Sequence, residues 1–243
     1  MRIARIATPA GPVHVRESID GWVPIEDPYP AFAEGRDPVD AGPPLLGELL
    51  PPCAPLVVVG IAQNGPEHAS PVQAWLKSPR SVVASGVPVT LRRDAGVTVA
   101  EGEIAIVIGR ETTGLTAANA HEYVLGVTAV NDLSSPDRAA SDPRNFESKA
   151  GEGYTPLGPV IDTDADLDDV TLELRIDGVP AGSTGSRALP ASPRECLAYL
   201  AGWTTLGPGD VVMTGAPTSQ APIDPGALVE VEVAGIRLVT PTR

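Results

Sequence analysis

Five apolar runs rich in β-branched residues, each bounded by Gly, Pro or Asp, constrain the fold of this chain more than any other feature. They occupy residues 97–108, 124–130, 170–176, 211–213 and 228–233. Such runs are typical of β-strands, and the 25 glycines and 27 prolines favour turns over long helices. Helical patterns do not alternate regularly with these runs, so a doubly wound sheet is disfavoured. We predict a mainly β (α+β) fold with a few peripheral helices.

Two helices are predicted beside this β body. One begins at Thr116 and covers the sequence AANAHEYV. The other follows Ser192-Pro193-Arg194-Glu195, which combines a capping box with a proline at the first helical position.

The N-terminal part of the chain has a different character. The pair Asp20-Gly21 predicts a hairpin turn, and the proline-rich segment 34–55 is interpreted as a linker around a short helix. We therefore expect a small N-terminal β subdomain with its linker over residues 1–52 and the main domain over residues 53–243.

Charge and cysteine content exclude several classes of function. Lysine and arginine number 17 against 31 acidic residues, which gives a formal net charge of −14. A chain this acidic lacks the basic surface that binding to nucleic acid or to an anionic membrane requires. The two cysteines, Cys53 and Cys196, are too few for a disulfide framework. No 18-residue apolar run occurs, and we expect a cytoplasmic protein.

Two glutamates stand two positions apart near the start of the 97–108 run. In a strand, Glu101 and Glu103 share one face at a spacing of about 6.6–7 Å, while the isoleucines that follow lie on the opposite face. An isolated pair of this kind is more often a solvated strand edge. Asp132 follows the 124–130 run, directly after Asn131, and offers a third carboxylate. Three converging carboxylates suit a hard cation such as Mg²⁺ or Mn²⁺. Spacing alone leaves open whether Asp132 reaches the glutamates.

Four segments in order across roughly residues 56–240 carry a family resemblance: EGEIAIVIGR, TAVNDLSSPD, FESKAGEGYTPLGP and LGPGDVVMTGAP. They resemble the fumarylacetoacetate hydrolase family. The resemblance implies a mixed β-roll or sandwich of the kind formed by the C-terminal domain of that family, and a homodimer. It also implies a divalent metal, Mg²⁺ or Mn²⁺, held by Glu101, Glu103 and Asp132.

The resemblance further implies which residues contact the substrate. Lys149 is expected to be catalytic, in contact with the substrate or the metal shell. The turn Thr214-Gly215-Ala216 is expected to line the same pocket, and Lys77 to lie beneath it. Because the family's substrates are 2-oxo or β-diketo acids, the expected partner is a small molecule of that class.

The chain has only three histidines from which a catalytic base could come. His68, with Glu67 beside it, is the candidate base, and a loop histidine without a catalytic role is the alternative. In one branch of the family the histidine falls where Gln63 stands, and glutamine cannot take a proton at neutral pH. Gln63 is therefore expected to contact the substrate and not to act as a base. Either His68 serves instead or this chain lacks the base.

A second departure from the family follows Asp132, where members read close to NDVTARDxQ. Here Pro136 stands in place of the arginine and Ala139 in place of the glutamine. Arg138 is the candidate substitute for substrate contact.

Together with the chemistry of these residues, the resemblance implies an enzyme that stabilises an enolate with a divalent metal and carries out C–C bond hydrolysis, decarboxylation or isomerisation. The alternative is a protein with the family's fold that lacks ordinary hydrolase activity. Such a protein would serve as a binding module or in specialised biosynthesis.

Overall fold

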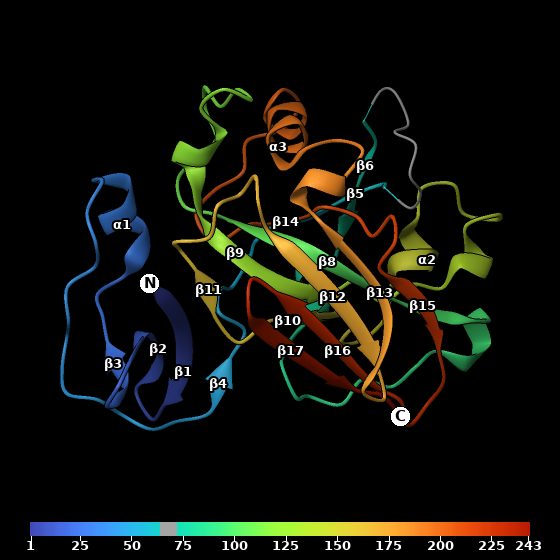
Figure 1. Ribbon diagram of the computed structural model, residues 1–243, viewed down its shortest axis with the longest axis horizontal. Helices are drawn as coiled ribbons and strands as arrows, with labels where there is room; N and C mark the ends of the chain where they lie inside the picture. The colour runs from blue at the N-terminus through green and yellow to red at the C-terminus, as the bar shows by residue number, and fades with distance from the viewer. Residues whose placement is uncertain (64–71) are drawn as a thin grey trace.

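The computed structural model describes residues 1–63 and 72–243, and it is mainly β (Figure 1). Within these residues the larger sheet has 13 strands, nine of which follow one hydrogen-bonded path. The path runs β3 (Gly21–Pro24), β2 (Gly11–Ser18), β1 (Arg2–Thr8), β11 (Ile161–Asp162), β9 (Val124–Asn131), β8 (Thr98–Ile108), β14 (Val211–Met213), β5 (Val58–Ile61) and β6 (Ala74–Lys77). Four strands attach beside it: β4 (Leu49–Leu50), β7 (Val82–Ala84), β10 (Thr155–Leu157) and β15 (Gln220–Ile223).

A second sheet of four strands covers β8 and β9 (Figure 1). Its order is β13 (Val179–Gly185), β12 (Thr171–Ile176), β16 (Leu228–Val233) and β17 (Ile236–Pro241). The second sheet packs closely over Gly102, where a Cβ would lie 3.3 Å from the side chain of Val231. The glycine between the two glutamates therefore admits a strand of the opposite sheet. The predicted mainly β fold is confirmed, and all five apolar runs are strands: β8, β9, β12, β14 and β16.

The helices are few, as predicted, but two of the predicted helices do not form where the sequence placed them. Helix α3 (Pro193–Ala201) begins with the predicted capping box, in which Ser192 and Glu195 bond each other's backbone amides. The helix predicted from Thr116 is wrong, because only a 3-10 turn at Ala120–Tyr123 forms there. Asn119 binds the backbone of Thr116 and so closes a local turn instead of a longer helix.

The short helix predicted within residues 34–55 is also wrong. The helix of this region, α1 (Pro28–Ala33), precedes that segment. Asp27 caps it and Pro28 occupies its first turn. The prolines that follow further along the chain disfavour a second helix.

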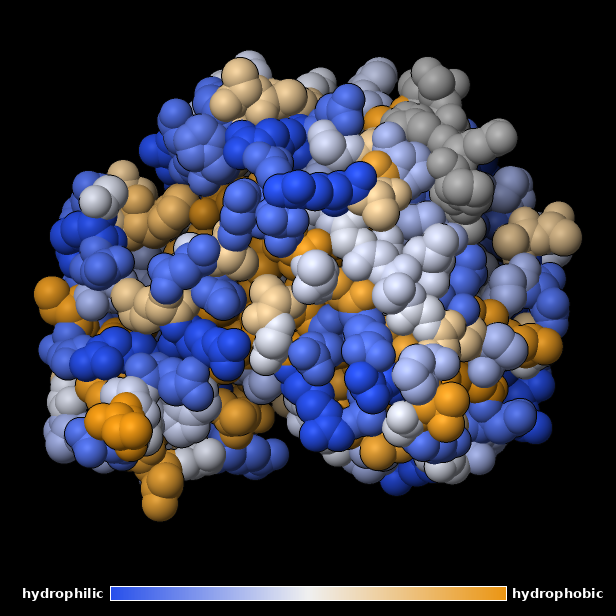
Figure 2. All heavy atoms as spheres, in the orientation of Figure 1, coloured by the Kyte–Doolittle hydropathy of each residue, from blue (hydrophilic) through white to orange (hydrophobic). Residues whose placement is uncertain are grey.

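The N-terminal strands form a lobe beside the body, drawn in blue in Figure 1. Strands β2 and β3 form the hairpin predicted at Asp20-Gly21, with Ser18 paired to Gly21. Strand β1 joins the lobe to the rest of the larger sheet by pairing with β11. On the face shown in Figure 2 the surface is notched between lobe and body at the lower edge. The boundary near residue 52 stays a prediction.

Strand β8 separates two apolar cores and so positions the candidate site. Ile104, Ile106 and Ile108 lie in the core between the two sheets. Ala105 and Val107, which share a face with Glu101 and Glu103, lie in a second core inside the curved larger sheet. The predicted alternation along β8 is thus confirmed, and both glutamates face the interior of the roll. Among the helices described, none is long and apolar enough to span a membrane.

Candidate active site

Three carboxylates converge at the end of the β8–β9 ladder. Each of Glu101, Glu103 and Asp132 offers an oxygen within 4.8 Å of the others, and all three side chains are buried. The pairing of Gly102 with Asn131 sets this register, and the Asp132 N–H donates to the Glu101 carbonyl at 2.8 Å. The structure therefore brings together the three residues that the sequence left unconnected.

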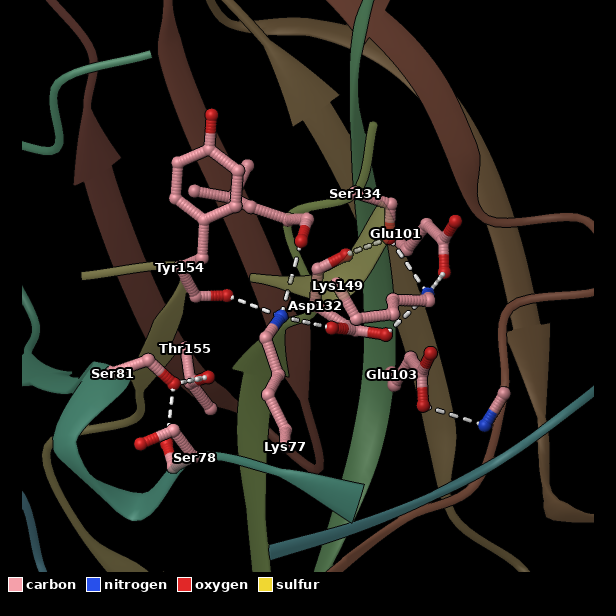
Figure 3. Close-up of polar contacts among 12 residues, drawn as sticks. Lys77, Ser78, Ser81, Glu101, Glu103, Asp132, Ser134, Lys149, Tyr154 and Thr155 are labelled. Carbon is pink, nitrogen blue, oxygen red and sulfur yellow. Dashed lines mark hydrogen bonds and ion pairs between the residues drawn. The ribbon is translucent and has the colours of Figure 1, made fainter. Parts of the chain in front are cut away.

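Lys149 places an ammonium group among these carboxylates (Figure 3). It ends the short helix α2 (Phe146–Lys149). Its Nζ donates to Glu101 Oε2 at 2.7 Å, Asp132 Oδ2 at 2.6 Å and Ser134 Oγ at 2.7 Å. The same Nζ lies 4.6 Å from the centre of the Trp75 ring, which favours a cation there.

Lys77 holds the other side of Asp132, beneath the carboxylates. Its Nζ donates to Asp132 Oδ1, to the Leu133 carbonyl at 3.0 Å and to the Tyr154 carbonyl at 2.6 Å. The side chain is 1% exposed. All three ammonium protons therefore have protein acceptors, and the structure directs this lysine toward Asp132 and away from solvent.

Glu103 is held in a different way. Its Oε2 accepts from the Gly215 N–H at 2.6 Å. Thr214 supports that turn by donating its hydroxyl to the Ile104 carbonyl at 3.1 Å, and Ala216 beyond it is buried. In the part of the chain that the structure describes, no lysine or arginine pairs with Glu103.

Burial and ion pairing shift the pKa values of these groups in different directions. Burial raises the pKa of Glu103 well above its usual range, and the nearby Asp132 adds to the rise. Burial also raises the pKa of Glu101, although Lys149 opposes the shift. For Asp132 the two lysines outweigh burial and lower the pKa. The ionised form of Glu103 is thus the least compensated charge in the cluster.

The donor set fits a hard divalent cation. Three carboxylates against two ammonium groups leave one negative charge in a buried site, and burying an uncompensated charge is costly. Carboxylate oxygens are the ligands that Mg²⁺ and Mn²⁺ prefer. A divalent cation at these oxygens would supply the countercharge that Glu103 lacks.

The remaining predicted residues lie in three kinds of place. Gln63 is buried and its side-chain amide is bonded to the backbone of Ala191 and Thr214. Arg138 pairs with Glu147 on the exposed side of α2, without a hydrogen bond to the three carboxylates. Glu67 and His68 lie outside the described residues.

The other two histidines lie apart from the cluster. His14, on β2, packs edge-on against Tyr29 with ring centres 5.9 Å apart. His121 lies beside Arg194 at the surface.

Sequence reasoning missed two residues that contact Lys149. Ser134 follows Asp132 by two positions, and Trp75 precedes Lys77 by two positions on β6. Trp75 shares a face of β6 with Lys77, and the period of two that paired the glutamates could have found it; Ser134 lies beyond the end of β9, where that period does not apply.

Comparison with known proteins gives the class of this protein. The model of the fumarylacetoacetate (FAA) hydrolase C-terminal family matches residues 56–242, and the chain belongs to that family. Protein Rv2993c of Mycobacterium tuberculosis is 32% identical to it over 262 residues, covering 99% of this chain and 97% of that protein.

Two further relatives have named activities. The crystal structure of 5-carboxymethyl-2-hydroxymuconate delta-isomerase from Mycobacterium smegmatis is 32% identical, with a TM-score of 0.90, and the match covers 100% of this chain and 99% of that one. The 4-hydroxyphenylacetate degradation bifunctional isomerase/decarboxylase of Escherichia coli is 29% identical over 175 residues, which cover 71% of this chain and 40% of that protein.

Proposed function

We propose that this chain is a divalent-metal-dependent enzyme that acts on a 2-oxo or β-diketo acid through an enolate. The observation that carries the proposal is the buried cluster of Glu101, Glu103 and Asp132, with Lys149 among them. Glu101, Glu103 and Asp132 would hold Mg²⁺ or Mn²⁺. When bound, the metal supplies Lewis-acid stabilisation of the negative charge that develops next to a carbonyl.

The residues around the cluster have distinct tasks in this proposal. Lys149 orients Glu101 and Asp132 and holds a positive charge where an anionic substrate would bind. Trp75 covers that ammonium and helps to exclude water from it. Thr214, Gly215 and Ala216 form the opposite wall, and Gly215 orients Glu103.

Isomerisation or decarboxylation is the reaction that we favour over C–C hydrolysis. Both reactions need an enolate and a proton donor, whereas hydrolysis also needs a base that activates water. Among the described residues, no histidine bonds to the carboxylates, and Lys149 has three acceptors for its protons. His68, with Glu67 beside it, is the proposed proton donor. The activities named for the isomerase from M. smegmatis and the enzyme from E. coli agree with this choice.

The test is turnover by purified, metal-stripped protein with and without added Mg²⁺ or Mn²⁺. Oxaloacetate reports decarboxylation, an acylpyruvate reports hydrolysis, and a 2-hydroxymuconate-type diene acid reports isomerisation by its ultraviolet absorbance. We expect metal-dependent turnover that Glu101→Gln and Glu103→Gln abolish. The matched control is Glu48→Gln, which removes a carboxylate at an exposed position. Turnover that survives in Glu103→Gln, or that needs no metal, contradicts the proposal.

A binding module without turnover is the second candidate. It is favoured by Gln63, whose amide is bonded to the protein backbone where one branch of the family has a histidine. This candidate predicts that metal increases affinity for oxo acids in calorimetry while no product forms.

The predicted homodimer is a further proposal. Light scattering of the purified chain, whose mass is 25.0 kDa, tests it directly.

A further inference from the structure

One peptide group connects Gln63 to the carboxylate cluster. The peptide between Thr214 and Gly215 is hydrogen-bonded at both of its ends. Its N–H donates to Glu103 Oε2 at 2.6 Å, and its carbonyl accepts from Gln63 Nε2 at 2.8 Å. The amide of Gln63 and the carboxylate of Glu103 are therefore joined through a single rigid, polar unit.

The rest of the Gln63 amide is bonded to a third segment of the chain. Nε2 also donates to the Ala191 carbonyl at 3.2 Å, and Oε1 accepts from the Ala191 N–H at 2.6 Å. Ala191 directly precedes the cap of α3. This pattern gives the amide one orientation, since a flipped amide would place its oxygen against two carbonyl oxygens.

We propose that Gln63 is a positioning residue for Glu103. It locks the Thr214–Gly215 peptide so that the N–H, and not the carbonyl, points at this carboxylate. The inference rests on the proposed function, in which Glu103 is a metal ligand. It assigns to Gln63 a structural task in the ligand shell, in place of direct contact with substrate.

The locking is needed because Gly215 is conformationally free. Its φ of +92° lies where glycine is favoured, and peptides flanking such a residue can rotate. A rotated peptide would place the Thr214 carbonyl against Glu103, and two oxygen acceptors would then repel each other. The bond from Gln63 also polarises the peptide, which strengthens its N–H as a donor.

Gln63 and Gly215 are also matched in shape. A Cβ on Gly215 would lie 2.5 Å from the Cβ of Gln63, so the glycine lets the two segments come into contact. Neither histidine nor glutamate could replace the amide in full. Neutral histidine has one donor and one acceptor, and ionised glutamate has no donor for the Thr214 carbonyl.

The first experiment observes the Gly215 amide by NMR in metal-free protein. Labelling threonine with ¹³C at the carbonyl and glycine with ¹⁵N selects the Thr–Gly pairs, which are 113–114, 184–185 and 214–215. We expect the Gly215 proton far downfield in the wild type and shifted upfield in Gln63→Met. Gln63→Glu, which keeps an acceptor for the Ala191 N–H, is the second variant if the first does not fold. The other two pairs are internal references.

The second experiment measures Mn²⁺ affinity by calorimetry. Changes to groups that orient a metal ligand typically lower affinity about 10–100-fold, and we expect that loss in either Gln63 variant. The matched control is Thr112→Val. The Thr112 hydroxyl accepts from the Leu206 N–H at 2.9 Å and so also ties two buried segments together. This control should lose stability and retain Mn²⁺ affinity.

The two experiments separate this inference from the proposed function. A folded Gln63 variant with an unchanged Gly215 amide overturns the positioning role, as does unchanged Mn²⁺ affinity in that variant when the wild type binds the metal. A wild type that binds neither Mn²⁺ nor Mg²⁺ overturns the metal assignment. In that case the Gly215 amide still decides the role of Gln63.

Discussion

The two ends of the carboxylate cluster are held by different kinds of group. Asp132 receives two buried ammonium groups, from Lys77 and Lys149. Glu103 receives one backbone N–H, from Gly215. The Asp132 end is thus electrically compensated by the protein itself, whereas Glu103 has no ion-pair partner among the described residues and burial raises its pKa. The difference indicates that the Glu103 end needs a bound cation as its countercharge. The Asp132 end would only help to orient that cation.

The largest effect on the free energy of unfolding is expected in metal-free protein, and it tests the difference between the two ends directly. Asp132→Asn leaves both lysines without their shared countercharge and turns an amide donor toward one of them. We expect it to lower the free energy of unfolding by about 5 kcal/mol. Glu103→Gln still accepts from Gly215 and replaces a carboxyl group whose pKa burial raises, so its effect should stay within about 1 kcal/mol of zero. Urea denaturation in a chelator measures both, and equal losses would contradict the comparison.

The next expected effect separates the two lysines. Lys77→Met removes the ammonium that Asp132, Leu133 and Tyr154 share beneath the site. We expect a loss of about 3–5 kcal/mol in the free energy of unfolding. Lys149→Met should cost less, because Lys149 is 8% exposed against 4% for Lys77, and because Lys77 also satisfies two backbone carbonyls. It should nevertheless abolish turnover. The opposite order of stabilities in urea would reverse the roles assigned to the two lysines.

Much of this arrangement follows from local patterns in the sequence. The period of two along β8 puts Glu101 and Glu103 on one face, and the end of an apolar run marks Asp132. These patterns depend only on strand geometry. The capping box of α3 is equally local, because Ser192 and Glu195 bond each other's backbone.

The remainder depends on contacts between distant segments. Lys77 and Asp132 are 55 positions apart, and only the curvature of the sheet brings β6 over the end of β9. The amide of Gln63 finds Ala191 at a separation of 128 positions. The spacing of residues along the sequence does not predict contacts between segments this far apart. The helix predicted from Thr116 failed for the opposite reason, since a local bond from Asn119 outweighed the helical pattern.

A smaller effect should accompany metal binding, and it tests the Glu103 end. At a metal concentration of 100 times Kd, binding stabilises the folded state by about 2.7 kcal/mol. We expect this gain for the wild type with Mg²⁺ or Mn²⁺ and a much smaller gain for Glu103→Gln at the same concentration. Denaturation curves with and without metal measure it. If Glu103→Gln shows the same metal-dependent stabilisation as the wild type, Glu103 does not bind the cation.

The smallest effect concerns the periphery of the Asp132 end, where Arg138 pairs with Glu147 on α2, the helix that carries Lys149. Both partners are more than 40% exposed, and surface pairs of this kind contribute about 0.2–1 kcal/mol. Arg138→Ala should therefore change stability by no more than that and leave KM for an oxo acid unchanged, because Lys149 has its own buried acceptors. A large rise in KM with kcat preserved would instead make Arg138 a substrate contact. The matched variant Glu147→Gln distinguishes the two cases, since it breaks the same pair and keeps the arginine.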